Sequence, residues 1–147
     1  MTSTPTITAD AYADGDQIGV LQTVTNAMTS SSGGAELGTL TVVDKAKVKH
    51  DLHIMFFDRA VTVASADNAA VDVVDAQMAL GYIGTVALAE ADYTAVLAGS
   101  TSATKLPAFF FNTAGSKSLY YLLVCRDSGG CDYGAVGDLV LRLAFRE

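Results

Sequence analysis

The chain has 147 residues, of which 50% are hydrophobic and only 17% charged, and its net charge at neutral pH is −7. A single domain is the usual organisation at this length, and such a chain buries enough apolar surface to fold without staples. The acidic charge argues against a nucleic-acid backbone or an anionic membrane as partner. No apolar run is long enough to span a bilayer.

The charged fraction lies well below the roughly 25% of an average soluble domain. Two arrangements account for so few charges: sheets that are covered on both faces, or a surface that is hidden against a partner. The first residues contain neither the basic region nor the apolar region of an export signal. We therefore expect synthesis in a cytoplasm without export by the general secretory route.

Short apolar runs alternate with clusters of Gly, Ser, Asn and Asp at fairly regular spacing, which is typical of a β-sandwich or barrel. Residues 4–8 contain a proline and β-branched residues, and we expect an extended arm or edge strand there. One short helix is predicted at 73–80, and residues 91–107 are predicted to be irregular. The further predicted strands are 19–27, 37–43, 47–57, 82–89, 108–112, 118–126 and 137–145.

This order gives about eight strands and one short helix, and it lacks the alternating strand–helix units of a doubly wound fold. We therefore predict an all-β fold, a single-domain jelly-roll-like β-sandwich over residues 11–147, preceded by an extended arm or edge strand over residues 1–10. Strand count alone leaves other Greek-key sandwiches open. The strand at 47–57 is apolar on both faces, which predicts a central strand of a covered sheet.

The two cysteines, Cys125 and Cys131, are separated by five residues that are typical of a turn. The spacing is not C-x-x-C, and no second pair completes a zinc site. The two sulfur atoms could face each other across a hairpin and oxidise outside the cell. Because we expect cytoplasmic synthesis, we predict two reduced, partly packed thiols.

The sequence contains no esterase elbow, no phosphate-binding loop, no dinucleotide fingerprint and no H-E-x-x-H zinc motif. His50 and His53 lie three apart on a predicted strand, so they are expected to point to opposite faces and not to share a metal. Asp10, Asp14 and Asp16 fail the calcium-loop pattern and are expected in a turn. We predict no enzymatic activity, no cofactor and no metal site.

Two segments are candidate contacts with a capsid or with another subunit. The N-terminal segment is polar and extended, and such segments add strands to neighbouring sheets, although a frayed terminus fits equally. Three lysines alternate on a predicted strand and would form a basic stripe for an acidic shell, or alternatively protect a strand edge. The contact candidates are Thr2, Thr4, Pro5, Ile7, Lys45, Lys47 and Lys49.

Six segments resemble, in their order, a family of small virion structural proteins of tailed phages. They are YADGDQIG (12–19), DLHIMFFD (51–58), ADNAA (66–70), GYIGTV (81–86), LYYLLVCRD (119–127) and DLVLRLAF (138–145). The likeness covers most of the chain and rests on turns and core strands. It implies a head decoration or cement-type role with a jelly-roll-like fold and trimeric assembly, and it carries over no functional residues.

We therefore expect a non-enzymatic capsid decoration protein that is made in the host cytoplasm and lies on the outer surface of the virion head. The expected partners are the major capsid protein and further copies in a homotrimer, with no nucleic acid and no membrane. One alternative is a tail, neck or fibre-associated virion module, which a low copy number would distinguish. Another is a glycan-binding adhesion domain in which Tyr93 or Tyr133 stacks on a sugar.

Overall fold

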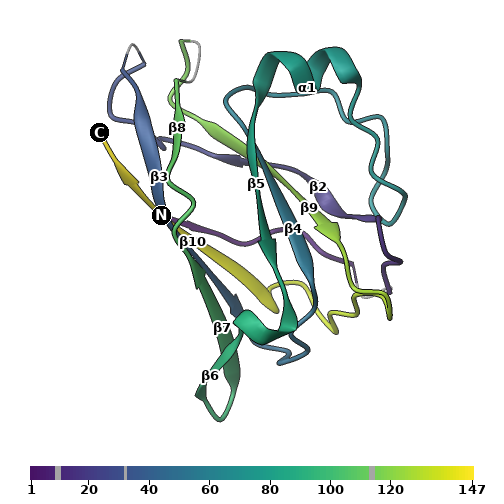
Figure 1. Cartoon of the computed structure of the whole chain (residues 1–147). Coiled ribbons are helices and arrows are strands. Elements are labelled where there is room, and N and C mark those ends of the chain that lie inside the picture. The colour runs from purple at the N-terminus through teal and green to yellow at the C-terminus, as the bar shows by residue number, and fades with distance from the viewer. Residues whose placement is uncertain (9–10, 32, 113–114) are drawn as a thin grey trace.

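Two antiparallel β-sheets face each other in the computed structural model of the chain (Figure 1). The structure describes residues 1–8, 11–31, 33–112 and 115–147. The prediction of an all-β sandwich with one short helix is confirmed, and these ranges contain ten strands where about eight were expected.

The larger sheet has the order β1–β10–β3–β7–β6, with β8 also paired to β3, and the smaller sheet has the order β2–β9–β4–β5. In chain order the strands are β1 (Thr2–Ser3), β2 (Gln17–Val24), β3 (Ala35–Asp44), β4 (Leu52–Phe57), β5 (Tyr82–Leu88), β6 (Thr94–Leu97), β7 (Ser100–Lys105), β8 (Phe109–Phe111), β9 (Leu119–Cys125) and β10 (Leu139–Arg146). The helix α1 is Asp75–Gly81, and a single 3₁₀ turn, η1, is Glu90–Asp92.

The chain crosses from one sheet to the other between β1, β2, β3 and β4 in turn, and again between β8, β9 and β10. Most strands that follow one another in sequence therefore lie in opposite sheets, and the exceptions are the pair β4–β5 and the consecutive strands β6, β7 and β8. This connectivity is the double Greek key of a jelly roll, as predicted.

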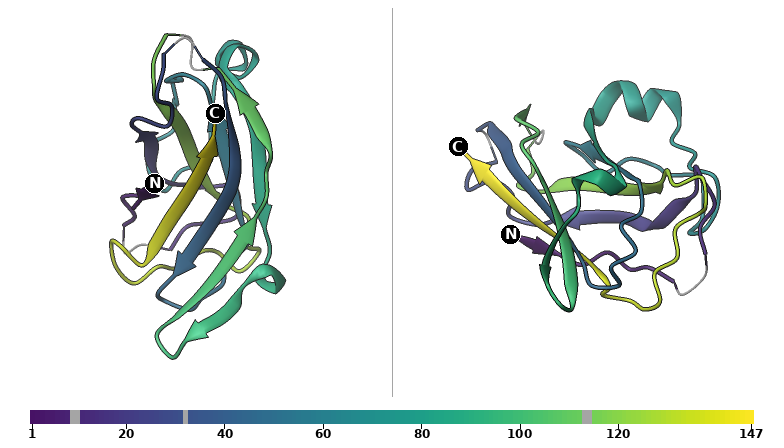
Figure 2. Two further views of the ribbon diagram at one scale, coloured as in Figure 1. Left: turned by 90° about the vertical axis from the view of Figure 1, so that its left-hand side faces the viewer. Right: turned by 60° about the horizontal axis from the view of Figure 1, so that its bottom comes forward.

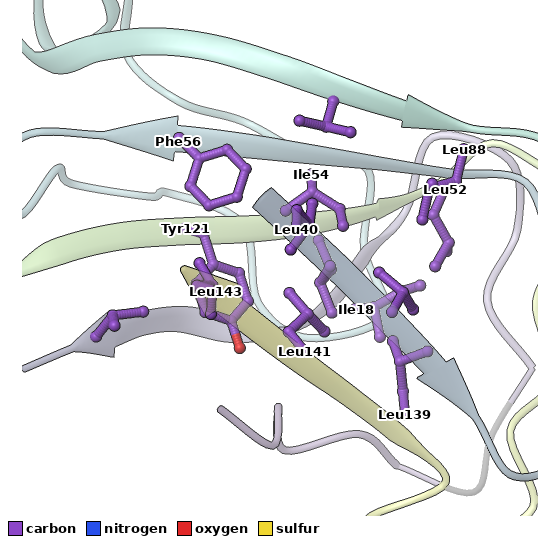
Figure 3. Close-up of a cluster of buried hydrophobic side chains, with 14 of the residues drawn as sticks. Ile18, Leu40, Leu52, Ile54, Phe56, Leu88, Tyr121, Leu139, Leu141 and Leu143 are labelled. Atoms are coloured by element: carbon purple, nitrogen blue, oxygen red, sulfur yellow. The ribbon is translucent and has the colours of Figure 1, made fainter. Parts of the chain in front are cut away.

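The core lies between the two sheets because each sheet has one continuous apolar face (Figure 3). Side chains on a strand alternate between faces, so cross-strand neighbours form apolar rows on the inner side. Two such rows are Leu141–Val42–Ala103 in the larger sheet and Leu123–Ile54–Val86 in the smaller sheet.

The outer face of the smaller sheet is covered by the chain itself. Phe57 of β4 and Leu122 of β9 point outward from the core, yet both are fully buried. Val61 in the loop after β4 and Met78 in α1 pack in the same cluster as these two side chains. The prediction that this strand is central in a covered sheet is confirmed, since β4 lies between β9 and β5.

The prediction that residues 91–107 are irregular is wrong. This segment contains η1, β6 and β7, and β7 pairs with β3 over five residues. Its side chains are mostly Ala, Ser and Thr, which give little contrast between an inner and an outer face, so the alternation that marks a strand is missing. Pairing with β3 imposes the extended conformation.

Residues 1–8 close one side of the sandwich, between the edges of β10 and β2. Met1 and Leu143 exchange backbone hydrogen bonds at the β10 edge. Further along, the carbonyl oxygen of Thr6 would lie 2.1 Å from a Cβ at Gly19, which has φ of 74°. Only glycine fits there, because a side chain would collide with the backbone and would strain the left-handed conformation.

We predict that Leu141→Ala lowers the free energy of unfolding by about 2–5 kcal/mol, because it leaves a cavity between the sheets. Leu141 is completely buried. The neighbouring Val140 points outward and is only half-buried, so Val140→Ala is the matched control and should cost less than about 1 kcal/mol. Urea unfolding with an unchanged m value measures the free energy of unfolding of both variants. Equal losses of stability would contradict the inward direction of Leu141 and the outward direction of Val140.

Candidate functional site

The outer face of the larger sheet is an open surface of the fold. The left view of Figure 2 looks onto it, with β10 and β3 running side by side. Its outward side chains are all exposed or half-buried, whereas the corresponding face of the smaller sheet is covered by α1 and its preceding loop. We call this surface, formed by the outward side chains of β10, β3 and β7, the open face.

The register of the strands defines which side chains meet on the open face. Most of them are small or β-branched and uncharged, and the hydroxyls of Thr41 and Thr104 lie 3.1 Å apart. The cross-strand rows are Val140–Val43–Ser102, Arg142–Thr41–Thr104, Ala144–Thr39 and Arg146–Glu36. The open face is therefore composed mainly of small, uncharged side chains.

The few charges on the open face are mainly positive, although the chain as a whole is acidic. Arg142 and Arg146 are both exposed. Within the described ranges neither arginine belongs to an ion pair, although Arg59, Lys105 and Arg126 do. Glu36 is the neighbour of Arg146 in the strand register and is half-buried. The arginines are therefore available to an external carboxylate.

A groove of about 530 Å³ opens at one end of the open face. The ring of Phe110 lies along it with 78% of the residue exposed, and the ring of Phe111 beneath packs edge-on against Phe145. Glu147 lies at the other wall, where its carboxylate accepts hydrogen bonds from the backbone and hydroxyl of Thr29. The lining residues are Gly34, Ala35, Glu36, Phe110, Phe111, Asn112, Arg146 and Glu147.

The N-terminal contact candidates divide into two groups. Thr2 is exposed and pairs with Arg142, so it borders the open face, and Thr4 is also exposed. Pro5 and Ile7 are buried, and Ile7 belongs to the core between the sheets. In this structure the segment adds a strand to its own sheet, and its two apolar side chains offer no surface to a partner.

The prediction that Lys45, Lys47 and Lys49 form a stripe on a strand is wrong. β3 ends at Asp44, and the lysines follow in a turn where Lys47 and Lys49 have φ near 60°. The buried carboxylate of Asp44 accepts both of their backbone N–H groups at 2.8 Å. That local capping competes with the extended conformation and ends the strand.

The prediction of two reduced thiols is also wrong. Cys125 and Cys131 form a disulfide, and both residues are completely buried. Both cysteines also hydrogen-bond through their backbones to the segment around Tyr12 and Asp16. The disulfide thus fixes the loop of residues 126–130 against the N-terminal part of the chain.

Within that loop, Asp127 is paired with His50, at 2.9 Å between the carboxylate and Nδ1. The backbone N–H of Asp132 donates to Nε2, also at 2.9 Å, which makes Nδ1 the protonated nitrogen. The hydrogen bond from His50 is the main cause that lowers the pKa of the Asp127 carboxyl. Because both ring nitrogens are occupied, the pair orders the loop and presents no free base to a substrate. The residues are too far apart in sequence for a motif to show this.

Two tyrosines adjoin this cluster from the inside. Tyr93 is 6% exposed and Tyr133 is fully buried, so neither ring can stack on a sugar as the glycan-binding alternative required. The hydroxyl of Tyr93 donates to the carbonyl oxygen of His50. Burial raises the pKa of Tyr133, whose hydroxyl has no hydrogen-bond partner among the described residues.

His53 lies apart from His50, in β4, beside a depression of about 460 Å³. Burial and the charge of Arg126 lower the pKa of its imidazole. The basic groups beside it are already paired, Lys105 with Asp92 at 2.6 Å and Arg126 with Asp14. The described lining of the depression contains no hydroxyl or thiol that could act as a nucleophile.

In the ranges that the structure describes, no three His, Cys, Asp or Glu side chains are grouped to hold a metal ion. No described helix is both long and apolar enough to cross a membrane. Comparison of the chain with known protein families, with characterised proteins and with solved structures finds no significant match.

We predict that replacing both disulfide cysteines by alanine lowers the free energy of unfolding by about 2 kcal/mol, because the bond closes a short loop. The two residues are six positions apart in the sequence. Reductant should destabilise the parent protein by a similar amount in chemical denaturation and should leave the double variant unchanged. An equal response of both proteins to reductant would contradict the bond.

Proposed function

We propose that the protein is a non-enzymatic structural protein that binds the outer surface of a phage head shell through its open face. The observation that carries the proposal is this uncovered sheet face, which is nearly uncharged and holds two arginines without acidic partners on an acidic chain. Such a surface complements a flat protein surface that carries carboxylates, since opposite potentials steer and orient association.

Three further points support this proposal. The resemblance of the sequence to virion structural proteins of tailed phages implies a decoration or cement-type role and a homotrimer. A buried disulfide is typical of proteins that reside in oxidising surroundings, as a released virion does. Finally, many copies on one shell turn modest individual contacts into a strong collective one.

We expect the chain to be abundant in purified virions, close to one copy per major capsid protein or one trimer per local three-fold position. A protein that reinforces the whole shell must occupy equivalent sites all over it. Quantitative mass spectrometry of virions measures the ratio of the two chains. A few copies per particle would favour a tail, neck or fibre location, and absence from virions would refute the proposal.

We expect the double variant Arg142→Glu/Arg146→Glu to bind shells that lack this protein at least about tenfold more weakly, which corresponds to about 1.4 kcal/mol. The matched control is Lys45→Glu/Lys47→Glu, which makes the same change of charge in the turn after β3. It should bind like the parent protein. Co-sedimentation with shells measures the binding of both variants. It is repeated at several salt concentrations, because salt weakens contacts between exposed charges.

If both variants lose binding equally, net charge and not the open face determines the affinity. If only the lysine variant loses binding, the turn after β3 is the contact. Either result would contradict the assignment of the open face as the shell-binding surface.

A further inference from the structure

The two cysteines of the disulfide hold the two ends of the segment 12–16. At one end, Tyr12 and Cys131 exchange both of their backbone hydrogen bonds, at 2.9 and 2.8 Å. At the other end, the backbone N–H of Cys125 donates to the carbonyl oxygen of Asp16 at 2.9 Å. The disulfide therefore fixes the spacing of the two positions that anchor this segment, and their Cα atoms lie 5.9 Å apart.

The chain is tightly packed at the contact between the disulfide loop and Tyr12. Gly130 has φ of 84°, and a Cβ there would lie only 2.8 Å from the carbonyl oxygen of Tyr12. Tyr12 is 1% exposed, and Cys125 and Cys131 are completely buried. Close-packed groups transmit displacements to their neighbours. A movement of Cys131 relative to Cys125 therefore displaces Tyr12.

Tyr12 connects the disulfide to residues 1–8, which we call the N-terminal segment. The hydroxyl of Tyr12 accepts a hydrogen bond from the backbone N–H of Thr8 at 2.8 Å, and it lies 2.9 Å from the Thr8 hydroxyl. At its other end, the N-terminal segment is bonded through Met1 to Leu143 of β10. Figure 1 shows the start of the chain running from the edge of β10 towards the loop that follows β9.

The other attachments of the N-terminal segment are short. β1 pairs with β10 over two residues, Thr2 and Ser3, and the Ser3 hydroxyl lies 2.7 Å from the hydroxyl of Tyr121. Ile7 is buried in the core. A segment with so few backbone pairs opens locally at a lower free energy than a core strand does. The contact with Tyr12 is therefore a large part of what seats this segment.

We propose that the disulfide is a redox lock on the N-terminal segment, which is seated when the bond is formed and opens when it is reduced. In the reduction a dithiol supplies two electrons, the sulfur–sulfur bond breaks, the two protons of the dithiol pass to the cysteines, and the dithiol becomes a cyclic disulfide. Cys125 and Cys131 are then joined only through residues 126–130. The two anchors of the segment 12–16 can therefore move apart, and Tyr12 no longer holds Thr8 in a fixed place.

The redox conditions around the protein then decide the state of the N-terminal segment. A cytoplasm keeps thiols reduced, whereas oxidising surroundings outside the cell favour the disulfide. In the seated state Pro5 and Ile7 are buried and Thr2 pairs with Arg142 at the border of the open face. Opening exposes the first two side chains and frees the edge of β10. The lock operates within one chain, so it does not rest on the proposed binding to a shell.

The test is the hydrogen exchange of single backbone amides, measured by NMR on the oxidised protein and on the protein kept reduced by excess dithiothreitol. Two amides report on the ends of the N-terminal segment: Thr8, which donates to Tyr12, and Leu143, which donates to Met1. We expect both to exchange at least about tenfold faster after reduction, through a local opening. A local opening exposes little surface, so these rates should depend only weakly on denaturant, unlike those of the amides of β4.

The test variant is Tyr12→Phe, and the matched control is Tyr121→Phe. Each keeps a buried ring and removes a hydroxyl that contacts the N-terminal segment, at Thr8 in the first case and at Ser3 in the second. Only the first hydroxyl belongs to the connection with the disulfide. In Tyr12→Phe the exchange of Leu143 should be fast already in the oxidised protein and should change by less than about twofold on reduction, whereas Tyr121→Phe should keep the full response. Circular dichroism and thermal unfolding establish that both variants are folded.

Three results would overturn the proposal. The first is that Thr8 and Leu143 exchange equally fast in the oxidised and the reduced protein. The second is that they accelerate only together with the amides of β4 and with the same dependence on denaturant, because the disulfide would then stabilise the whole fold and lock no segment. The third is a redox response in Tyr12→Phe as large as that in Tyr121→Phe, because the connection would then not pass through Tyr12.

Discussion

The structure depends on the burial of two apolar sheet faces against each other. In each core strand the direction of the side chain alternates from one residue to the next. Once Leu141 or Ile54 points inward, the neighbouring side chains must therefore point outward. The rows of the open face are therefore a consequence of the core rows one residue away. A shift of one residue in β3 or β10 would exchange the two faces and bury Arg142.

The low charge content of the chain is explained by how unequally the remaining surfaces are covered. The smaller sheet uses α1 and the loop before it to bury its outer face around Phe57 and Leu122. The larger sheet leaves its outer face bare, and Leu106 and Phe110 are largely exposed. One of the two arrangements expected for a chain with few charges, a covered sheet face, thus occurs in the smaller sheet, and a surface hidden against a partner stays a prediction.

The polar groups of the fold mostly serve to end strands and to fix loops. Asp44 caps the turn that follows β3, and Asp127 orders the disulfide loop through His50. The sequence shows these carboxylates only as isolated acids, because their partners are backbone N–H groups or a histidine 77 positions away. For that reason no sequence motif indicates the pair or the cap, and the sequence pattern wrongly predicts that the lysines after Asp44 lie on a strand.

The sequence by itself determined the sandwich, the short helix and the covered central strand, because strong alternation and turn residues are local signals that each segment carries alone. It missed β6 and β7, whose small side chains carry no such signal. Only the tertiary structure decided the disulfide, the burial of Pro5 and Ile7, and the identity of the open face. Each of these depends on which distant segments lie side by side, and pairing between distant strands is a property of the whole chain.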